Sequence, residues 1–168
     1  MRNATCLVAM LLSSASAVAQ STHDASLFSV TKSENRNEVI YAIHLDARCA
    51  PFGDAPVHAF WRMNERGGTI EPLLGREEPA YGIGAQRVLA RDAEGGAVDV
   101  TLRALPSRHV VVRTRRHDAT CETTSTLAIA GAQATLTNID VRLKFLGVDY
   151  VVVSGLTGSG VVREKIQP

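Results

Sequence analysis

The chain has 168 residues, of which 45% are hydrophobic and 21% are charged. Its 18 basic and 17 acidic residues give a formal net charge of +1 with the histidines neutral. This balance argues against a dedicated nucleic-acid-binding protein, which normally carries a strong basic excess, and against a polybasic protein of the membrane surface.

The first 19 residues have the plan of a secretory signal peptide. Arg2 precedes an apolar run at residues 6–12, and Ala17-Val18-Ala19 forms an A-x-A cleavage site. The run is too short to cross a bilayer as a helix, which needs about 20 residues; the alternative is a buried first strand or helix. We expect residues 1–19 to be removed on export. Residues 20–168, with equal numbers of acidic and basic groups, would then form a single exported β domain, periplasmic or secreted, without a transmembrane segment.

Apolar and polar residues alternate with period two along much of the remaining chain, which is typical of strands with one face on the core. The clearest segments are residues 39–45, 57–63, 98–102 and 139–145. Less regular ones are residues 27–31, 81–89, 108–113, 122–129, 150–153 and 161–166.

Glycine-rich turns separate these segments at short, fairly regular intervals. Residues 71–78 lack the alternation and predict a short helix or helical turn. The sequence therefore predicts an all-β fold, a single antiparallel β-barrel or β-sandwich of about ten strands with one short helical turn. It does not separate the barrel from the sandwich.

Two cysteines remain once Cys6 is removed with the leader. Cys49 and Cys121 form an even pair, which in an oxidising compartment predicts a disulfide. The alternative is two unrelated buried thiols. Neither cysteine belongs to a C-x-x-C motif, which argues against a thioredoxin-type redox site or a zinc ribbon.

The five histidines show neither H-x-x-x-H spacing nor a Cys/His ligand block. His44 and His58 fall on the polar side of their strands, where two histidines could meet across a ladder. The sequence nevertheless favours exposed histidines, and we expect no metal and no cofactor.

Catalytic motifs are also absent from the sequence. Ser107, Ser154 and Ser159 do not lie in a G-x-S-x-G elbow, and the glycines around Ser159 lack the Lys-Ser/Thr ending of a phosphate loop. The basic stretch at residues 113–117 is interpreted as a solvated strand end, with an acidic partner as the alternative.

Several short segments together resemble a bacterial exported family, the domain of unknown function 4833 family. The matching residues are Phe28, Val30, residues 32–37, Val39, Tyr41, residues 56–61, residues 80–83, Gly155, Thr157, Gly158, Glu164 and Lys165. The resemblance implies an exported single domain. It carries over no catalytic residues, and the cysteine pair is not part of it.

Five residues in these segments are candidate surface or ligand positions: Asn35, Arg36, His58, Trp61 and Tyr81. Asn35 and Arg36 also suit a turn before a strand, and Trp61 has the inward parity of Val57, which favours a core position.

The function predicted from the sequence is an exported, non-catalytic binding or interaction protein of the bacterial cell envelope. Its partner would be an unknown small ligand or an envelope protein, and not a nucleic acid. The alternative is a small periplasmic enzyme of the hydrolase type, which would use polar residues assembled by the fold.

Overall fold

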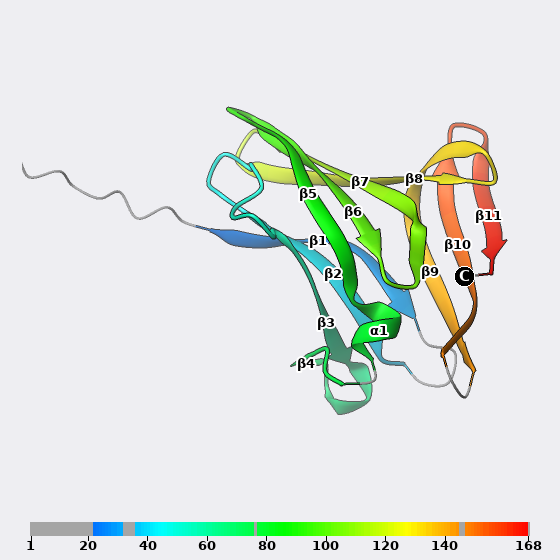
Figure 1. Cartoon of the computed structure of the whole chain (residues 1–168). Helices are drawn as coiled ribbons and strands as arrows, with labels where there is room; N and C mark the ends of the chain where they lie inside the picture. Colours follow the sequence, from blue (N-terminus) through cyan, green and yellow to red (C-terminus); the bar gives the residue numbers. More distant parts are fainter. Residues whose placement is uncertain (1–21, 32–35, 76, 145–146, 168) are drawn as a thin grey trace, which may run out of the picture.

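The computed structural model describes residues 22–31, 36–75, 77–144 and 147–167 (Figure 1). Over these residues, eleven strands form one sheet, in the order β4-β3-β2-β1-β9-β8-β7-β6-β5, with β10 paired to β9 and β11 to β10. The strands are β1 (His23–Thr31), β2 (Glu38–Leu45), β3 (Val57–Met63), β4 (Thr69–Pro72), β5 (Ile83–Asp92), β6 (Gly95–Leu102), β7 (Leu105–His117), β8 (Thr120–Ile129), β9 (Ala132–Lys144), β10 (Gly147–Thr157) and β11 (Gly160–Ile166). The predicted all-β class is confirmed.

Pairing between these strands is antiparallel except in one ladder. β1 pairs with β9 in parallel, from Ser29 opposite Asn138 to Thr31 opposite Asp140. On its other edge β1 is antiparallel to β2, its neighbour in the chain. The first strand thus lies in the middle of the sheet, between two strands that are far apart in sequence.

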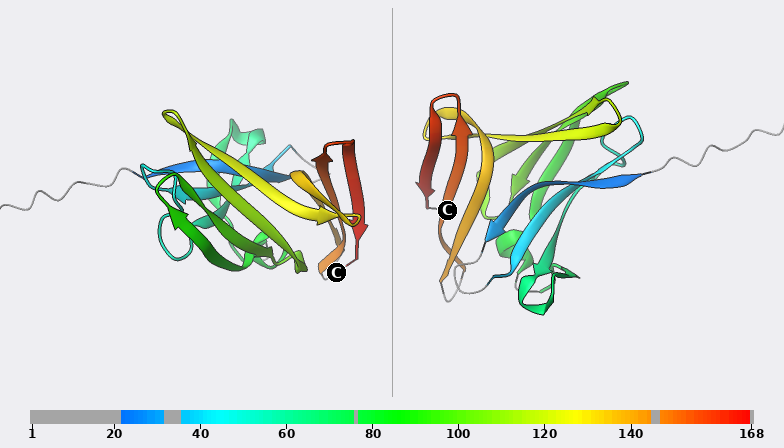
Figure 2. Two further views of the ribbon diagram at one scale, coloured as in Figure 1. Left: turned by 90° about the horizontal axis from the view of Figure 1, so that it is seen from above. Right: turned by 180° about the vertical axis from the view of Figure 1, so that it is seen from behind.

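The sheet is strongly rolled, so that β5–β7 face β1–β3 across the interior (Figures 1 and 2). The side chain of Gln86 in β5 links the two ends of this roll. Its Oε1 accepts a hydrogen bond from the Val57 N–H at 2.8 Å, and its Nε2 donates to the Val57 carbonyl at 2.9 Å. No main-chain ladder closes the gap within the described segments. Both predicted architectures, barrel and sandwich, therefore stay open.

One hydrophobic core fills the roll. Inward-facing side chains of both layers are fully buried, among them Ile43, Val98, Val112 and Ile139. Each such side chain contributes roughly 1.5–3 kcal/mol when it leaves water. Because both layers contribute to the same cluster, the core itself holds the sheet in its rolled shape.

The helical segment differs in position from the prediction. Thr69–Pro72, predicted in part as helical, pairs with β3 as β4. A 3-10 turn, η1 (Asn64–Arg66), precedes β4, and the helical turn α1 occupies Glu78–Tyr81, with a proline in its first turn. Proline suits that position because its missing N–H would have no partner there. No helix in the described ranges is long and apolar enough to cross a membrane.

Candidate functional site

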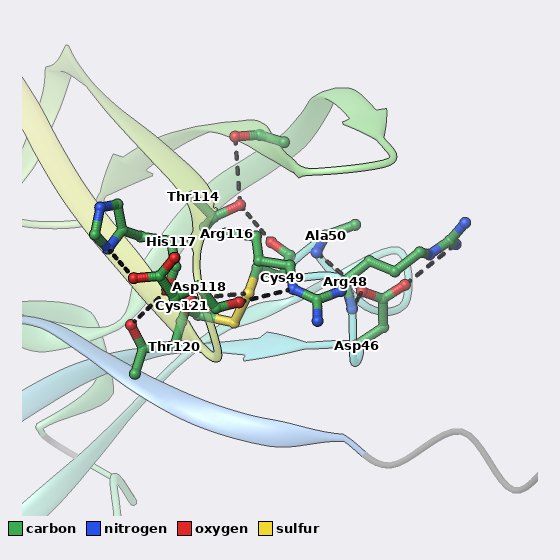
Figure 3. The surroundings of a disulfide bond; sticks show 11 residues. Asp46, Arg48, Cys49, Ala50, Thr114, Arg116, His117, Asp118, Thr120 and Cys121 are labelled. Carbon is green, nitrogen blue, oxygen red and sulfur yellow. Dashed lines mark hydrogen bonds and ion pairs between the residues drawn. A yellow bond between two sulfur atoms is a disulfide. The ribbon is translucent and has the colours of Figure 1, made fainter.

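The predicted disulfide is present, and it ties the loop after β2 to the first residues of β8 (Figure 3). Cys49 and Cys121 are joined with a Cα–Cα distance of 5.4 Å. Thr114 in β7 donates a hydrogen bond from Oγ1 to the Cys49 carbonyl at 2.7 Å. Both thiols are therefore in the bond, and neither is free to act as a nucleophile.

Asp46 shapes the same loop. Its Oδ1 accepts hydrogen bonds from the backbone N–H groups of Arg48 and Ala50, at 2.8 and 2.9 Å. Burial raises the pKa of the Asp46 carboxyl, but these two bonds and the Arg48 guanidinium outweigh it, and the net pKa is lowered. The carboxylate is thus the form that holds the turn.

The loop then returns alongside the end of β2. The Phe52 N–H donates to the His44 carbonyl at 2.9 Å, and the His44 N–H donates to the Pro56 carbonyl at 2.8 Å. The backbone of His44 is therefore fixed on both sides, and Phe52 lies beside the imidazole, with ring centroids 6.3 Å apart.

Three polar side chains converge at this point: Asp24 of β1, His44 of β2 and His58 of β3, which we call the Asp-His-His cluster. Asp24 lies directly opposite His44, and His58 lies opposite Ala42, two residues from His44. Because successive side chains of a strand alternate between faces, all three project on the same face. It is the face opposite the main core, since their inward neighbours Ile43 and Val57 belong to that core.

The donor atoms of the cluster are close together. His44 Nδ1 forms a hydrogen bond with Asp24 Oδ1, and His58 Nε2 lies 3.4 Å from Asp24 Oδ2. One donor atom from each residue lies within 4.8 Å of the other two. Side-chain exposure is 47% for Asp24, 45% for His44 and 39% for His58, so a solute can reach the cluster directly.

Two imidazoles and a carboxylate can act in two ways. They can share protons as a hydrogen-bonded ion pair, or the neutral imidazole nitrogens and a carboxylate oxygen can bind a divalent metal ion together. Phe60 packs against His58 on the same face, with ring centroids 5.9 Å apart. Phe52 and Phe60 thus give the polar cluster an apolar border.

The sequence-predicted candidates divide between the two faces of the sheet. His58 joins the Asp-His-His cluster, whereas Trp61 and Tyr81 lie in the core, only 7% and 2% exposed, with ring centroids 5.4 Å apart. Arg36 is exposed, and its carbonyl accepts a hydrogen bond from Asn64. Asn35 lies outside the described residues. The structure therefore does not gather the five candidates into one site.

Trp61 and Tyr81 hold the helical turn α1 against the core. Trp61 donates from Nε1 to Glu77 Oε2 at 2.6 Å, and the buried Tyr41 hydroxyl donates to the Tyr81 carbonyl. Burial raises the pKa of the Tyr41 phenol, and the neighbouring Tyr81 adds to this effect. Tyr41 therefore remains a protonated donor, and the role of this group is structural.

A separate groove of about 790 Å³ lies over β5–β8 and includes part of the predicted basic stretch. Its lining carries Arg113 and Arg115 together with Asp92, Glu94 and Glu122. Its lining therefore carries charges of both signs, and the groove does not form a basic patch.

The fold and its cross-link define a small all-β domain with a rolled, mostly antiparallel sheet and a polar cluster on the face opposite the core. The chain belongs to the family described as Domain of unknown function (DUF4833), whose model matches residues 28–163. Membership of this family, which the sequence predicted, is thereby confirmed. No curated protein and no solved structure matches the chain.

Proposed function

We propose that the protein is an exported, non-catalytic binding protein of the cell envelope, and that the Asp-His-His cluster is its binding site. The convergence of Asp24, His44 and His58 from three neighbouring strands is the observation that carries this proposal. Polar side chains held by paired strands form a more precise site than side chains on a free loop. Their exposure suits a ligand taken up from solution.

Export is supported by two independent features of the chain. The leader has the charged start, apolar middle and small-residue cleavage site of a signal peptide. The Cys49–Cys121 bond is of a kind that persists in oxidising compartments and is rare in the cytosol.

The export part is tested by producing the full-length chain in a bacterial host with a periplasm. Intact-mass spectrometry of the protein from the periplasm or the medium should give the mass of a chain that begins at Gln20, and alkylation without reductant should label neither cysteine. Recovery of the chain with an intact Met1 in the cytosol would overturn export.

The binding part is tested by native mass spectrometry of the same exported protein. We expect a bound mass that is present in the wild type and in His109→Ala, and that is lost in His58→Ala. His109 is a matched control because its Nδ1 also contacts an aspartate, Asp99, at 3.0 Å. It lies on β7, away from the cluster. The same mass retained in His58→Ala, or none in the wild type, would contradict the proposed site.

The cluster also favours a second candidate, a small periplasmic hydrolase. Histidine and carboxylate side chains are the commonest general acids and bases. A set of ester and phosphate substrates separates the two functions: turnover by the wild type that His58→Ala abolishes would support the enzyme, and turnover by neither would support binding.

A further inference from the structure

We propose that Asp24, His44 and His58 together bind one divalent first-row transition-metal ion, for which Zn²⁺ is the probe. This inference rests on the proposed function, because it names the ligand class of that same site. The donor set is two imidazole nitrogens and one carboxylate oxygen, a combination that zinc and its neighbours accept.

The distances between the donors fit a metal ion. Metal–ligand bonds of about 2.0–2.1 Å place two ligands of a tetrahedral ion about 3.3 Å apart. His58 Nε2 and Asp24 Oδ2 already lie 3.4 Å apart, and His44 Nδ1 touches the other carboxylate oxygen. One donor atom from each residue lies within 4.8 Å of the others, so rotation of the side chains is the change that brings all three to bonding distance of one ion.

The backbone under the three ligands is fixed before a metal binds. The ladders β1–β2 and β2–β3 set the register of all three residues. His44 is held further by the hydrogen bonds of its own N–H and carbonyl. A preorganised site loses little conformational entropy on binding, so three ligands are enough for a specific site.

The site is open rather than closed. Structural zinc sites bury four protein ligands, whereas three protein ligands leave a position for water or for a donor from another molecule. The three side chains here are 39–47% exposed. The geometry thus favours a site whose ion keeps one position open to water or to a donor from another molecule.

Other histidines of the described chain lack this arrangement. His109 contacts Asp99, and His117 lies 3.6 Å from Asp118 and 3.9 Å from Glu122. Elsewhere among the residues that the structure describes, no three His, Cys, Asp or Glu side chains bring their donor atoms this close together. His109 is therefore the matched control for a histidine beside a carboxylate.

The experiment is Zn²⁺ titration by isothermal calorimetry of the exported, disulfide-bonded protein after treatment with a chelator and dialysis. We expect one Zn²⁺ per chain. Asp24→Asn, His44→Ala and His58→Ala should each weaken binding by at least about 10-fold, since even outer-shell partners of a metal are worth 10–100-fold. His109→Ala should bind as the wild type does. Thermal unfolding of each apo variant checks that the loss of binding does not come from loss of the fold.

Equal Zn²⁺ affinity in the wild type and the His44→Ala/His58→Ala double variant would overturn the metal site. In that case, if the wild type carries a bound mass in native mass spectrometry that His58→Ala removes, the proposed binding function stands, and its ligand is of another class. If neither Zn²⁺ nor a native mass depends on His58, the metal site and the proposed function both fail.

Discussion

Removal of the disulfide should lower the free energy of unfolding by about 4 kcal/mol. Cys49 and Cys121 are 72 residues apart in the chain. For a closed loop of that size, the loss of chain entropy in the unfolded state corresponds to about 4 kcal/mol at 25 °C. Since domains are typically stable by only about 5–15 kcal/mol, this one bond supplies a large share of the total.

Urea unfolding followed by fluorescence measures the effect directly, because Trp61 is the one tryptophan of the chain and is only 7% exposed when folded. Three samples are compared: the oxidised wild type, the reduced wild type and Cys49→Ala/Cys121→Ala. The last two should have similar midpoints, well below that of the oxidised protein. Their m-values should be larger, because an unfolded chain without the cross-link exposes more surface.

The reasoning would be refuted if both samples without the bond lost less than about 1 kcal/mol relative to the oxidised protein. A loss confined to the alanine variant would instead point to packing around Cys49, which is only 2% exposed, and not to the entropy of the closed loop.

Three further substitutions test other parts of the fold. Gln86→Ala should cost about 1–3 kcal/mol in urea unfolding, because it leaves the N–H and carbonyl of the buried Val57 unpaired. The pKa of Asp46 is lowered from 3.8 in the folded state. As the pH falls through that ordinary value, the unfolded chain therefore binds more protons than the folded one. The stability that the carboxylate contributes is therefore present above it and falls as the pH drops through the folded pKa. In Asp46→Asn, Tm should therefore fall less than in the wild type as the pH is lowered through this range. Gly95→Ala should cost at least about 1 kcal/mol, measured as a lower Tm, because Gly95 has φ 151° and a Cβ there would lie 2.1 Å from the Thr114 carbonyl oxygen.

A different result would contradict each of these three predictions. An unchanged urea midpoint in Gln86→Ala would mean that the Val57 groups find other partners. Asp46→Asn with the full acid dependence of the wild type would assign that dependence to other carboxyls. A wild-type Tm in Gly95→Ala would show that the β6–β7 ladder can shift to admit a methyl group.

Strand alternation predicted most of the sheet because many of the strands have one face on the core and one face in water. Residues 57–63 illustrate this, since Val57 and Trp61 face the core and His58 does not. The parallel β1–β9 ladder joins residues about a hundred positions apart, and no local pattern reports such a contact. The short β4 was missed because Thr69–Pro72 is mostly exposed and held by pairing with β3 alone.

Of the three residues in the candidate site, only the two histidines could be anticipated from the sequence. The polar parity of His44 and His58 is a local signal, and it indicated that the two rings could meet across a ladder. Asp24 carried no such signal, because the first residues of β1 are exposed on both faces and show no apolar alternation. Its place beside the histidines depends on register, which is set by hydrogen bonds with β2.

The position of β1 in the middle of the sheet affects both the folding of the chain and its tendency to aggregate. This strand is synthesised before the other strands that the structure describes, yet one of its partners, β9, comes more than a hundred residues later. Contacts of such long range slow folding, and until they form, β1 and β9 each present an unpaired edge that can recruit another chain. A truncation that removes His23–Thr31 would expose the edges of β2 and β9 at once and would take Phe28 and Val30 out of the core. Aggregation of the truncated chain is therefore the failure to expect.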